Sequence, residues 1–314
     1  MFELLKLNNV VDFLRHAKVI SALSIVLMIA SVASLATKGI NWGLDFTGGT
    51  VVEIVYKEAK ETAELRRAVE AQGFEGVIVQ HFGAATDLLI RVPPKAGTGN
   101  ELVAKIEQAA RSLESDAVIK RVEFVGPQVG KELAEQGGLA VLTAIICILA
   151  YVAFRFEWRL ALGAVAALVH DVVVTLGVFS FFFLEFDLTV LAALLAVVGY
   201  SLNDTIVVFD RVRENFRKMR KGSPSHVVNT SVTQTMTRTI ITTGTTLFVV
   251  IALFIQGGSM IHGFATAMLL GIGFGTYSSI YVASYISIKL GLCREHMMPV
   301  VIEKEGADQE SLTP

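Results

Sequence analysis

The residue in this chain with the clearest chemical potential is a carboxylate inside an apolar stretch. Residues 188–211 read LTVLAALLAVVGYSLNDTIVVFDR, and the apolar run from Leu188 to Phe209 is broken by Asn203 and Asp204. About 20 apolar residues, each rising roughly 1.5 Å, cross the hydrocarbon core of a bilayer. A carboxylate in such a run is costly, so we expect Asp204 to face the bundle interior and a partner. Burial favours its neutral form and a nearby cation its charged form, which makes Asp204 a candidate proton carrier.

Polar neighbours surround Asp204 on the expected helix. Tyr200 and Ser201 lie three and four residues before it and extend a polar stripe, and Asn203 precedes it directly. We therefore regard Tyr200 and Asn203 as additional polar membrane residues. The alternative for Asp204 is a helix-packing acid that hydrogen bonds hold in place.

Arg238 is the best cation to face Asp204, because both lie near the same membrane surface. The alternative is an arginine that snorkels to the interface. The helix that carries Arg238 is rich in threonine and too polar to face lipid on all sides, so we expect it to line the bundle interior. Its threonines are Thr235, Thr237, Thr239, Thr242, Thr243, Thr245 and Thr246.

Two further features of the apolar spans stand out. Asp171 follows His170 inside another span and is a second ionisable candidate, although a role in packing is equally open. Small residues recur every fourth position in the last span, which permits close helix contact inside the chain or with a partner. They are Gly263, Ala267, Gly271, Gly275, Ser279 and Ala283, and Gly271 and Gly275 lie at the centre.

The composition indicates a polytopic membrane protein. Hydrophobic residues make up 53% of 314 positions and cluster into spans, while the net charge of −2 is uninformative because the charges are segregated. The predicted fold has six transmembrane helices and one external α+β domain. The divisions are an N-terminus (1–18), a first span (19–37), the external domain (38–136), five further spans (137–292) and a C-terminal tail (293–314). The first apolar run also resembles a secretory signal, but its length and the later spans favour an uncleaved anchor.

The external domain is predicted to be ferredoxin-like, with the order βαββαβ. Strands are expected at 50–56, 77–82, 88–92 and 117–125, and helices at 62–72 and 100–113, with Asn100 as a cap. Glycine-rich segments flank the domain at 43–49 and 124–130. Gly48, Gly49, Gly126, Pro127 and Gly130 are either turn residues or hinges that couple the domain to the bundle.

Lysine and arginine in short loops set the orientation. Bases gather near the N-terminus, at Arg155 and Arg159, and along 211–221, whereas 185–187 and 256–263 have none. Both termini are therefore expected in the cytoplasm and residues 38–136 outside. A loop beside a span explains 211–221 more simply than nucleic-acid binding. Cys147 and Cys293 suggest no disulfide or thiolate metal site, and no glycine-rich nucleotide loop is visible, so we expect no cofactor.

Five motifs in order resemble the SecD/SecF family of bacterial inner-membrane protein-export proteins, which is related to the resistance-nodulation-division (RND) transporters. The resemblance covers nearly the whole chain. The motifs are GLDFTGG at 43–49, FVGPQVGK at 124–131, HD at 170–171, GYSLNDTIVVFDRVREN at 199–215 and RTIITTGTT at 238–246.

The resemblance implies half of an RND-type core, with SecD supplying the other half. It implies a non-enzymatic subunit that uses the proton-motive force to assist late steps of Sec-dependent translocation, with Asp204 and Arg238 as the membrane acid and arginine. Implied partners are the SecYEG channel, YajC and YidC, the unfolded polypeptide in transit and membrane lipid. Two alternatives stay open: half of a proton-coupled lipid or drug exporter, and a scaffold subunit without ion chemistry.

Overall fold

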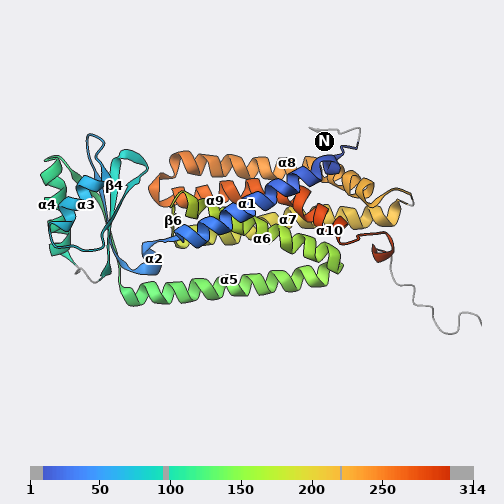
Figure 1. Cartoon of the computed structure of the whole chain (residues 1–314), viewed down its shortest axis with the longest axis horizontal. Helices are drawn as coiled ribbons and strands as arrows, with labels where there is room; N and C mark the ends of the chain where they lie inside the picture. Colours follow the sequence, from blue (N-terminus) through green and yellow to red (C-terminus); the bar gives the residue numbers. More distant parts are fainter. Residues whose placement is uncertain (1–9, 95–98, 220, 298–314) are drawn as a thin grey trace, which may run out of the picture.

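The computed structural model describes residues 10–94, 99–219 and 221–297. A long helical bundle carries a small α+β domain at one end (Figure 1). The described chain begins and ends at the opposite end of the bundle, where Val11 N–H donates to Thr233 and Arg217 donates to the Met297 carbonyl. Residues 1–9 and 298–314 of the predicted terminal segments lie outside the described part.

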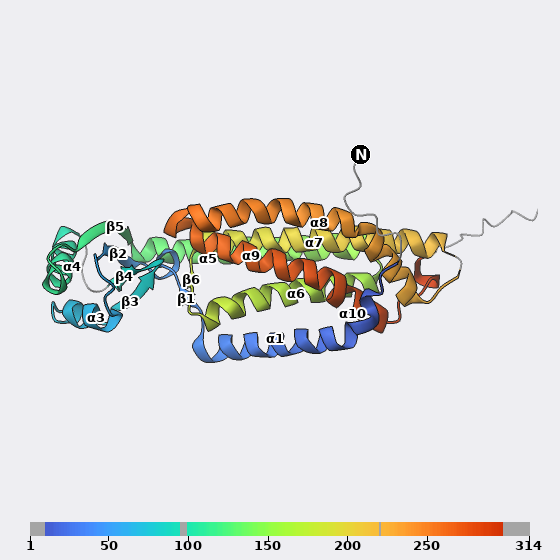
Figure 2. The same ribbon diagram turned by 90° about the horizontal axis from the view of Figure 1, so that it is seen from above.

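Six helices of the described part are long and apolar enough to span a membrane. A short 3-10 turn, η1 (Phe13–His16), precedes the first of them. They are α1 (Ala17–Lys38), α5 (Pro127–Arg155), α6 (Trp158–Phe181), α7 (Leu188–Lys218), α8 (Pro224–Gln256) and α9 (Gly258–Ser278), the last continued by the π-helical η3 (Ser279–Ala283) and by α10 (Ser284–Lys289). Helices α6, α7 and α9 are the most buried, and α1, α5 and α8 lie around them (Figure 2).

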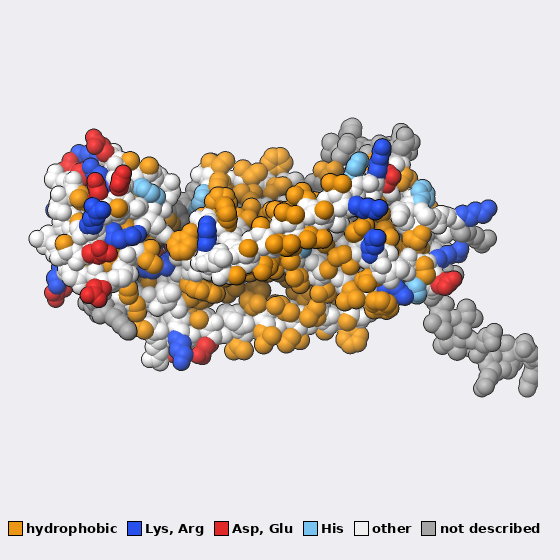
Figure 3. Space-filling view, viewed as in Figure 1, with side chains coloured by type: hydrophobic (Ala, Val, Ile, Leu, Met, Phe, Trp, Pro, Cys, Tyr) orange, Lys and Arg blue, Asp and Glu red, His pale blue; other side chains and the backbone are white. Residues whose placement is uncertain are grey.

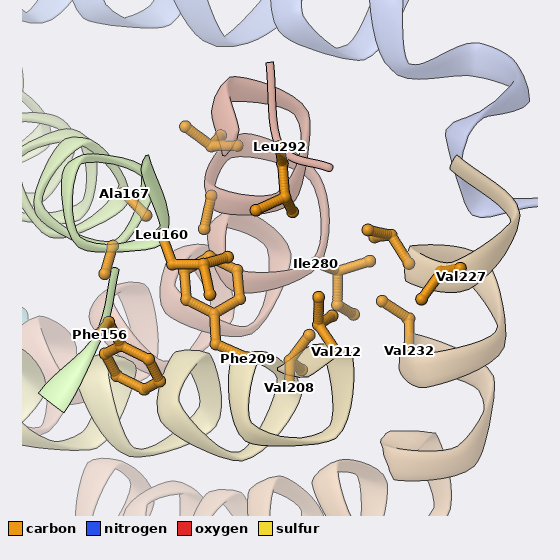
Figure 4. Packing of buried hydrophobic residues seen from close by; sticks show 14 of the residues in the cluster. Phe156, Leu160, Ala167, Val208, Phe209, Val212, Val227, Val232, Ile280 and Leu292 are labelled. Atoms are coloured by element: carbon orange, nitrogen blue, oxygen red, sulfur yellow. The ribbon is translucent and has the colours of Figure 1, made fainter. Parts of the chain in front are cut away.

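The surface supports this assignment. Hydrophobic side chains cover the middle of the bundle and charged side chains gather at its two ends (Figure 3). A core cluster at the end away from the α+β domain joins α6, α7, α8 and η3 around Phe209, which is 1% exposed (Figure 4). Because lipid can cover the outer faces, only this interior needs close packing against protein.

The α+β domain contains a four-stranded antiparallel sheet in the order β3-β4-β2-β5. Helices α3 and α4 pack on one face of the sheet. Leu65 of α3, Ile106 of α4 and Val52 of β2 are fully buried in this contact. Along the chain the elements are β2 (Gly49–Val55), α3 (Thr62–Glu70), β3 (Ile78–Phe82), β4 (Ala84–Val92), α4 (Asn100–Leu113) and β5 (Val118–Val125). The opposite face of the sheet is turned toward the bundle and carries a separate small cluster.

Several boundaries differ from those expected. Asn100 is the first helical residue of α4, not its cap; Gly99 occupies that place at a φ of 99°, which suits glycine. The expected domain boundary at 136/137 falls inside α5, which starts at Pro127 and runs unbroken from the sheet domain into the bundle. Most of the basic run predicted as a loop, through Lys218, is the last part of α7.

Candidate functional site

Asp204 lies in the interior of the bundle. Asp204 belongs to α7 and is 3% exposed, and its Oδ2 atom is buried without a hydrogen-bond partner among the described residues. A buried polar atom left unpaired costs free energy, so such atoms in native structures need an explanation. An acid that binds and releases a proton is one explanation.

Arg238 extends from α8 close enough to attract the Asp204 carboxylate electrostatically. The two side chains form no ion pair within 4.0 Å in the described structure. The arginine side chain is exposed at the surface of the single chain, as is Asn203. Tyr200 is half-buried and donates to Thr243 Oγ1 at 3.3 Å, joining α7 to α8.

Asp171 is more deeply buried than Asp204, with 0% exposure on α6. Ser201 and Ser278 donate to its Oδ2 at 2.6 and 2.7 Å, and His170 Nδ1 lies 3.0 Å from its Oδ1. The buried acid therefore ties α6 to α7 and α9. Thr205 and Ser279 form a second contact of 2.8 Å between α7 and η3 nearby.

The small-residue stripe of the last span makes its contacts inside the chain. A Cβ added to Gly271 would lie 2.2 Å from a Val197 methyl group, and one added to Gly275 would lie 2.9 Å from the Ser201 Cβ. These distances leave no space for a side chain, so the α9 backbone packs directly against side chains of α7. The approach holds Ser201, and with it Asp171, in place.

The prediction that the threonine-rich helix lines the interior holds in the single chain only for the start of the run, where Thr235 and Thr239 are buried. Thr245 is exposed, and Thr242 and Thr246 are only partly buried. Their hydroxyls donate to the carbonyl four residues earlier, at 2.9 to 3.0 Å, so each threonine is satisfied within its own helix. Polarity alone therefore did not require an interior position.

The two glycine-rich segments meet at the base of the α+β domain. A Cβ on Gly48 would lie 3.0 Å from Pro127 Cα, and one on Gly130 would lie 3.0 Å from Gly48 N. Gly49 has a φ of 121°, and a Cβ there would lie 2.5 Å from the Val92 carbonyl oxygen. Gly126 ends the loop as the N-cap of α5, and Pro127 begins the helix. These glycines allow a close junction between the entry and the exit of the domain.

The same region is bound to the turn between α6 and α7. Strand β1 (Asn41–Trp42) pairs in parallel with β6 (Glu185–Phe186), and the short helix α2 (Leu44–Thr47) follows. The Asp45 carboxylate accepts from Leu188 N–H at 2.9 Å, at the first residue of α7. We call residues 41–49, 126–130 and 185–188 the joint. It connects the α+β domain directly to the helix that carries Asp204.

Arg91 on β4 completes the joint. Its guanidinium pairs with Glu185, donates to the Trp42 carbonyl and reaches Asn41 Oδ1 at 3.5 Å. Asn41 in turn donates to the Phe183 carbonyl at 3.0 Å. Burial raises the pKa of Glu185 above its ordinary value, the Arg91 charge opposes this rise and the Asp187 charge adds to it. One arginine thus links the sheet, the entry segment and the α6–α7 turn.

Sequence reasoning singled out the two glycine-rich segments of the joint but missed Arg91 and residues 185–187. Residues 185–187 were interpreted as a short acidic turn and Arg91 as part of a strand, because pairs 94 residues apart leave no periodic signal. The one available signal was a charged residue in an otherwise apolar strand, LLIRV. Among the described residues, no group of three His, Cys, Asp or Glu side chains is arranged to hold a metal ion.

The chain matches two described protein families. "Protein export membrane protein SecD/SecF, C-terminal" covers residues 105–292, and "SecD/SecF GG Motif" covers 33–60, which contains the glycine pair of the joint. The protein translocase subunit SecF of Vibrio alginolyticus is 55% identical over 99% of this chain and 100% of its own length. The Escherichia coli O157:H7 subunit SecF is 49% identical over 98% and 96%.

A solved structure has the same architecture. SecDF from Thermus thermophilus, described as a translocon-associated membrane protein, superposes with a TM-score of 0.82 at 36% identity. The match covers 91% of this chain and 39% of the SecDF chain, so this chain spans less than half of that protein. A SecDF structure in the super-membrane-facing form matches with a TM-score of 0.68 over the same shares. On these matches, the chain belongs to the SecD/SecF family of protein-export membrane proteins.

Proposed function

We propose that this chain is the SecF-type half of a proton-coupled complex that assists protein translocation across a bacterial inner membrane. The observation that carries this proposal is the buried Asp204 carboxyl, whose Oδ2 lacks a partner while Arg238 attracts it from the next helix. An ionisable side chain in a membrane span is a functional site by default. The relatives named above are protein translocase subunits, which supplies the process that this chemistry would serve.

A SecD chain is the proposed partner in the membrane. Asn203 and Arg238 are exposed on α7 and α8 although they lie in or beside apolar runs. Polar and charged groups facing lipid are costly, so a second helical bundle is needed to cover them. The SecDF relative, in which the matching region makes up 39% of the chain, is consistent with such a second half.

The proposed orientation places both termini in the cytoplasm and the α+β domain, which we assign to the ferredoxin-like class, in the periplasm. Arg159 and Arg217 donate to the Leu290 and Met297 carbonyls, close to where the described chain ends, and Arg155 pairs with Asp210 near the same end of α7. Positive residues in short loops favour the cytoplasmic side. The SecYEG channel, with YajC and YidC, would then lie beside the complex, and the polypeptide would emerge beside the α+β domain.

The mechanism follows from the position of α7. Protonation of Asp204 removes a buried charge and its attraction to Arg238, so α7 and α8 repack. The first residue of α7 is bound to Asp45 in the joint, so its movement reaches the α+β domain. One proton crossing ~150 mV releases roughly 3.5 kcal/mol, enough to shift a two-state element with a gap of a few kcal/mol. Repeated capture and release of the polypeptide fits this energy better than one long pull.

The test is Asp204→Asn, which keeps the shape but cannot titrate. Export of a secreted protein by the reconstituted complex should become insensitive to an imposed proton gradient, while assembly with the partner is unchanged. Asp210→Asn is the matched control: it lies on the same helix, but at the interface and paired with Arg155, so gradient-stimulated export should persist.

Two results would contradict the proposal. Gradient-stimulated export by Asp204→Asn would support a scaffold subunit. Loss of lipid or drug efflux with normal protein export would support the exporter alternative.

A further inference from the structure

The bundle contains a second buried acid that the proposed mechanism does not use. We propose that Asp171 and His170 together form a second proton-binding site and that this site is mechanically linked to Asp204 through Ser201. The ligand is a proton, bound by the carboxylate–imidazole pair as a unit. Its use in protein export rests on the proposed function; its existence does not.

The charge balance requires a proton at this pair. Asp171 is 0% and His170 3% exposed, and within the described chain no lysine or arginine lies in ion-pairing range of Asp171. An isolated charge buried inside a membrane protein costs several kcal/mol. A carboxylate beside a neutral imidazole carries a net charge of −1, so the pair becomes neutral when it binds one more proton. That proton lies on Asp171 or makes His170 an imidazolium.

The hydrogen bonds favour a charged carboxylate, and the charge balance then places the extra proton on His170. Ser201 and Ser278 both direct hydroxyls at Oδ2, and an ionised carboxylate is an acceptor only. His170 Nδ1–H can donate to the remaining Oδ1 at 3.0 Å. The extra proton then lies on His170 Nε2, which is buried and lacks a partner among the described residues. A proton on this atom is not held by a hydrogen bond, and its transfer requires a water or a side chain to come within hydrogen-bond distance of Nε2.

The polar groups near the pair come from α7, α9, η3 and α1. Asp204 lies on α7, three residues beyond Ser201. From α9, the Tyr277 ring lies 6.1 Å from the His170 ring, and Tyr281 of η3 follows at 5.5 Å from Tyr277. Helix α1 contributes the hydroxyl of Ser24, 2.8 Å from the Tyr277 hydroxyl. None of these groups supplies a fixed positive charge, so the proton on the pair is the neutralising one.

Ser201 connects the two acids. Its hydroxyl donates to Asp171, while its carbonyl accepts from Thr205 and Ser279 at 3.2 and 3.3 Å. Gly275 packs against it closely enough to exclude a side chain. Ser278, the other donor to Asp171, directly precedes the π-helical segment η3, and such segments recur at functional sites. Gain or loss of the proton changes the strength of the hydrogen bonds that Asp171 accepts from Ser201 and Ser278. This change shifts α7 next to Asp204.

Infrared difference spectroscopy of the complex with its partner, reconstituted in lipid and titrated with pH, tests the site. Wild type should show imidazole and carboxylate bands that change together, and Asp171→Asn and His170→Gln should each remove this coupled change. Thr175→Val is the matched control, because it alters a buried polar residue one turn further along α6 without removing a titratable group. Coupled bands that persist in Asp171→Asn would overturn the proposal.

Two more variants keep the test decisive. Ser201→Ala deletes one donor to the charged carboxylate, so the pair should take up its proton more readily than in wild type; an unchanged titration would refute the link. The Asp204→Asn complex separates the two proposals. Normal export by that complex together with an intact titration of the pair refutes only the proposed function, and arrested export with no titration of the pair refutes only this inference.

Discussion

Replacing Arg91 with glutamine should detach the α+β domain from the membrane bundle. Arg91 contacts Glu185, the Trp42 carbonyl and Asn41, so it binds three segments that are distant in sequence. Removing one partner of a buried ion pair leaves the other charge uncompensated and costs about 3–5 kcal/mol. The two side chains are 10% and 20% exposed, so water screens part of this cost, and we expect about 2–3 kcal/mol.

The partner variant should behave differently. Burial of Glu185 outweighs the attraction of Arg91, as the raised pKa indicates. Glu185→Gln removes this unfavourable burial but leaves the Arg91 guanidinium without a counter-charge; the Trp42 and Asn41 oxygens and the new amide oxygen still accept from it, so the cost should be smaller than for Arg91→Gln, about 1–2 kcal/mol. The double variant should resemble Glu185→Gln alone. Such non-additivity distinguishes an uncompensated charge from a simple loss of contacts.

Docking of the α+β domain on the bundle should depend on pH in a direction that follows from Glu185. The carboxyl of Glu185 has a raised pKa when the domain is docked and an ordinary one when it is undocked and solvated. The docked state therefore holds a proton that the undocked state has released. Docking is strongest below the ordinary pKa of glutamate and weakens as the pH rises through the raised value. Glu185→Gln should abolish this dependence, and Arg91→Gln should increase it because the opposing cation is gone.

The separation of the α+β domain from the bundle can be measured in the reconstituted complex by double electron–electron resonance between two spin labels. Spin labels at Lys105 on α4 and Met260 on α9, with the cysteines at 147 and 293 replaced, report the separation of domain and bundle. A cost of 2–3 kcal/mol raises the undocked population about 30- to 150-fold, so Arg91→Gln should broaden the distance distribution. Arg111→Gln, which breaks a solvent-exposed pair within α4, is the control. A distribution as narrow as wild type in Arg91→Gln would refute the reasoning.

Two further predictions concern packing and ionisation. Gly271→Ala forces α9 away from Val197 and should lower the melting temperature of the purified protein, at a cost of about 1–3 kcal/mol; Gly273→Ala, where a Cβ meets nothing within 4 Å, should not. Burial, reinforced by Glu114, raises the pKa of Tyr56 from 10.0 to about 12. The domain should therefore lose about 3 kcal/mol as the pH rises from 10 to 12, and Tyr56→Phe should not show this loss in pH-dependent unfolding; equal losses would contradict it.

Local pattern was enough to locate the spans and the acids. Runs of apolar residues gave all six long helices, because the length of a span is fixed by the membrane and not by tertiary contacts. Asp171 and Asp204 were identifiable because a carboxylate is conspicuous in such a run. The strands and helices of the α+β domain were located to within a few residues, since alternation and helical periodicity are local properties.

Local pattern failed where an element extended beyond its apolar part. Helix α5 begins at Pro127 and α7 continues to Lys218, because helical hydrogen bonds do not stop at the membrane surface. The hydroxyls of Thr242, Thr245 and Thr246 on α8 donate to carbonyls of their own helix, so their polarity did not determine which way they face.

Only the tertiary structure decided the contacts between segments that are distant in sequence. The sequence by itself determined that Asp171 and Asp204 lie within membrane-length apolar helices, since hydropathy is a property of the local run. It did not determine that Ser201 and Ser278 hold Asp171, or that Arg91 and Asp45 fasten the α+β domain to the start of α7. Each of those contacts joins residues from different elements, and their partners are selected by how helices and sheet pack and not by the residues beside them in the chain.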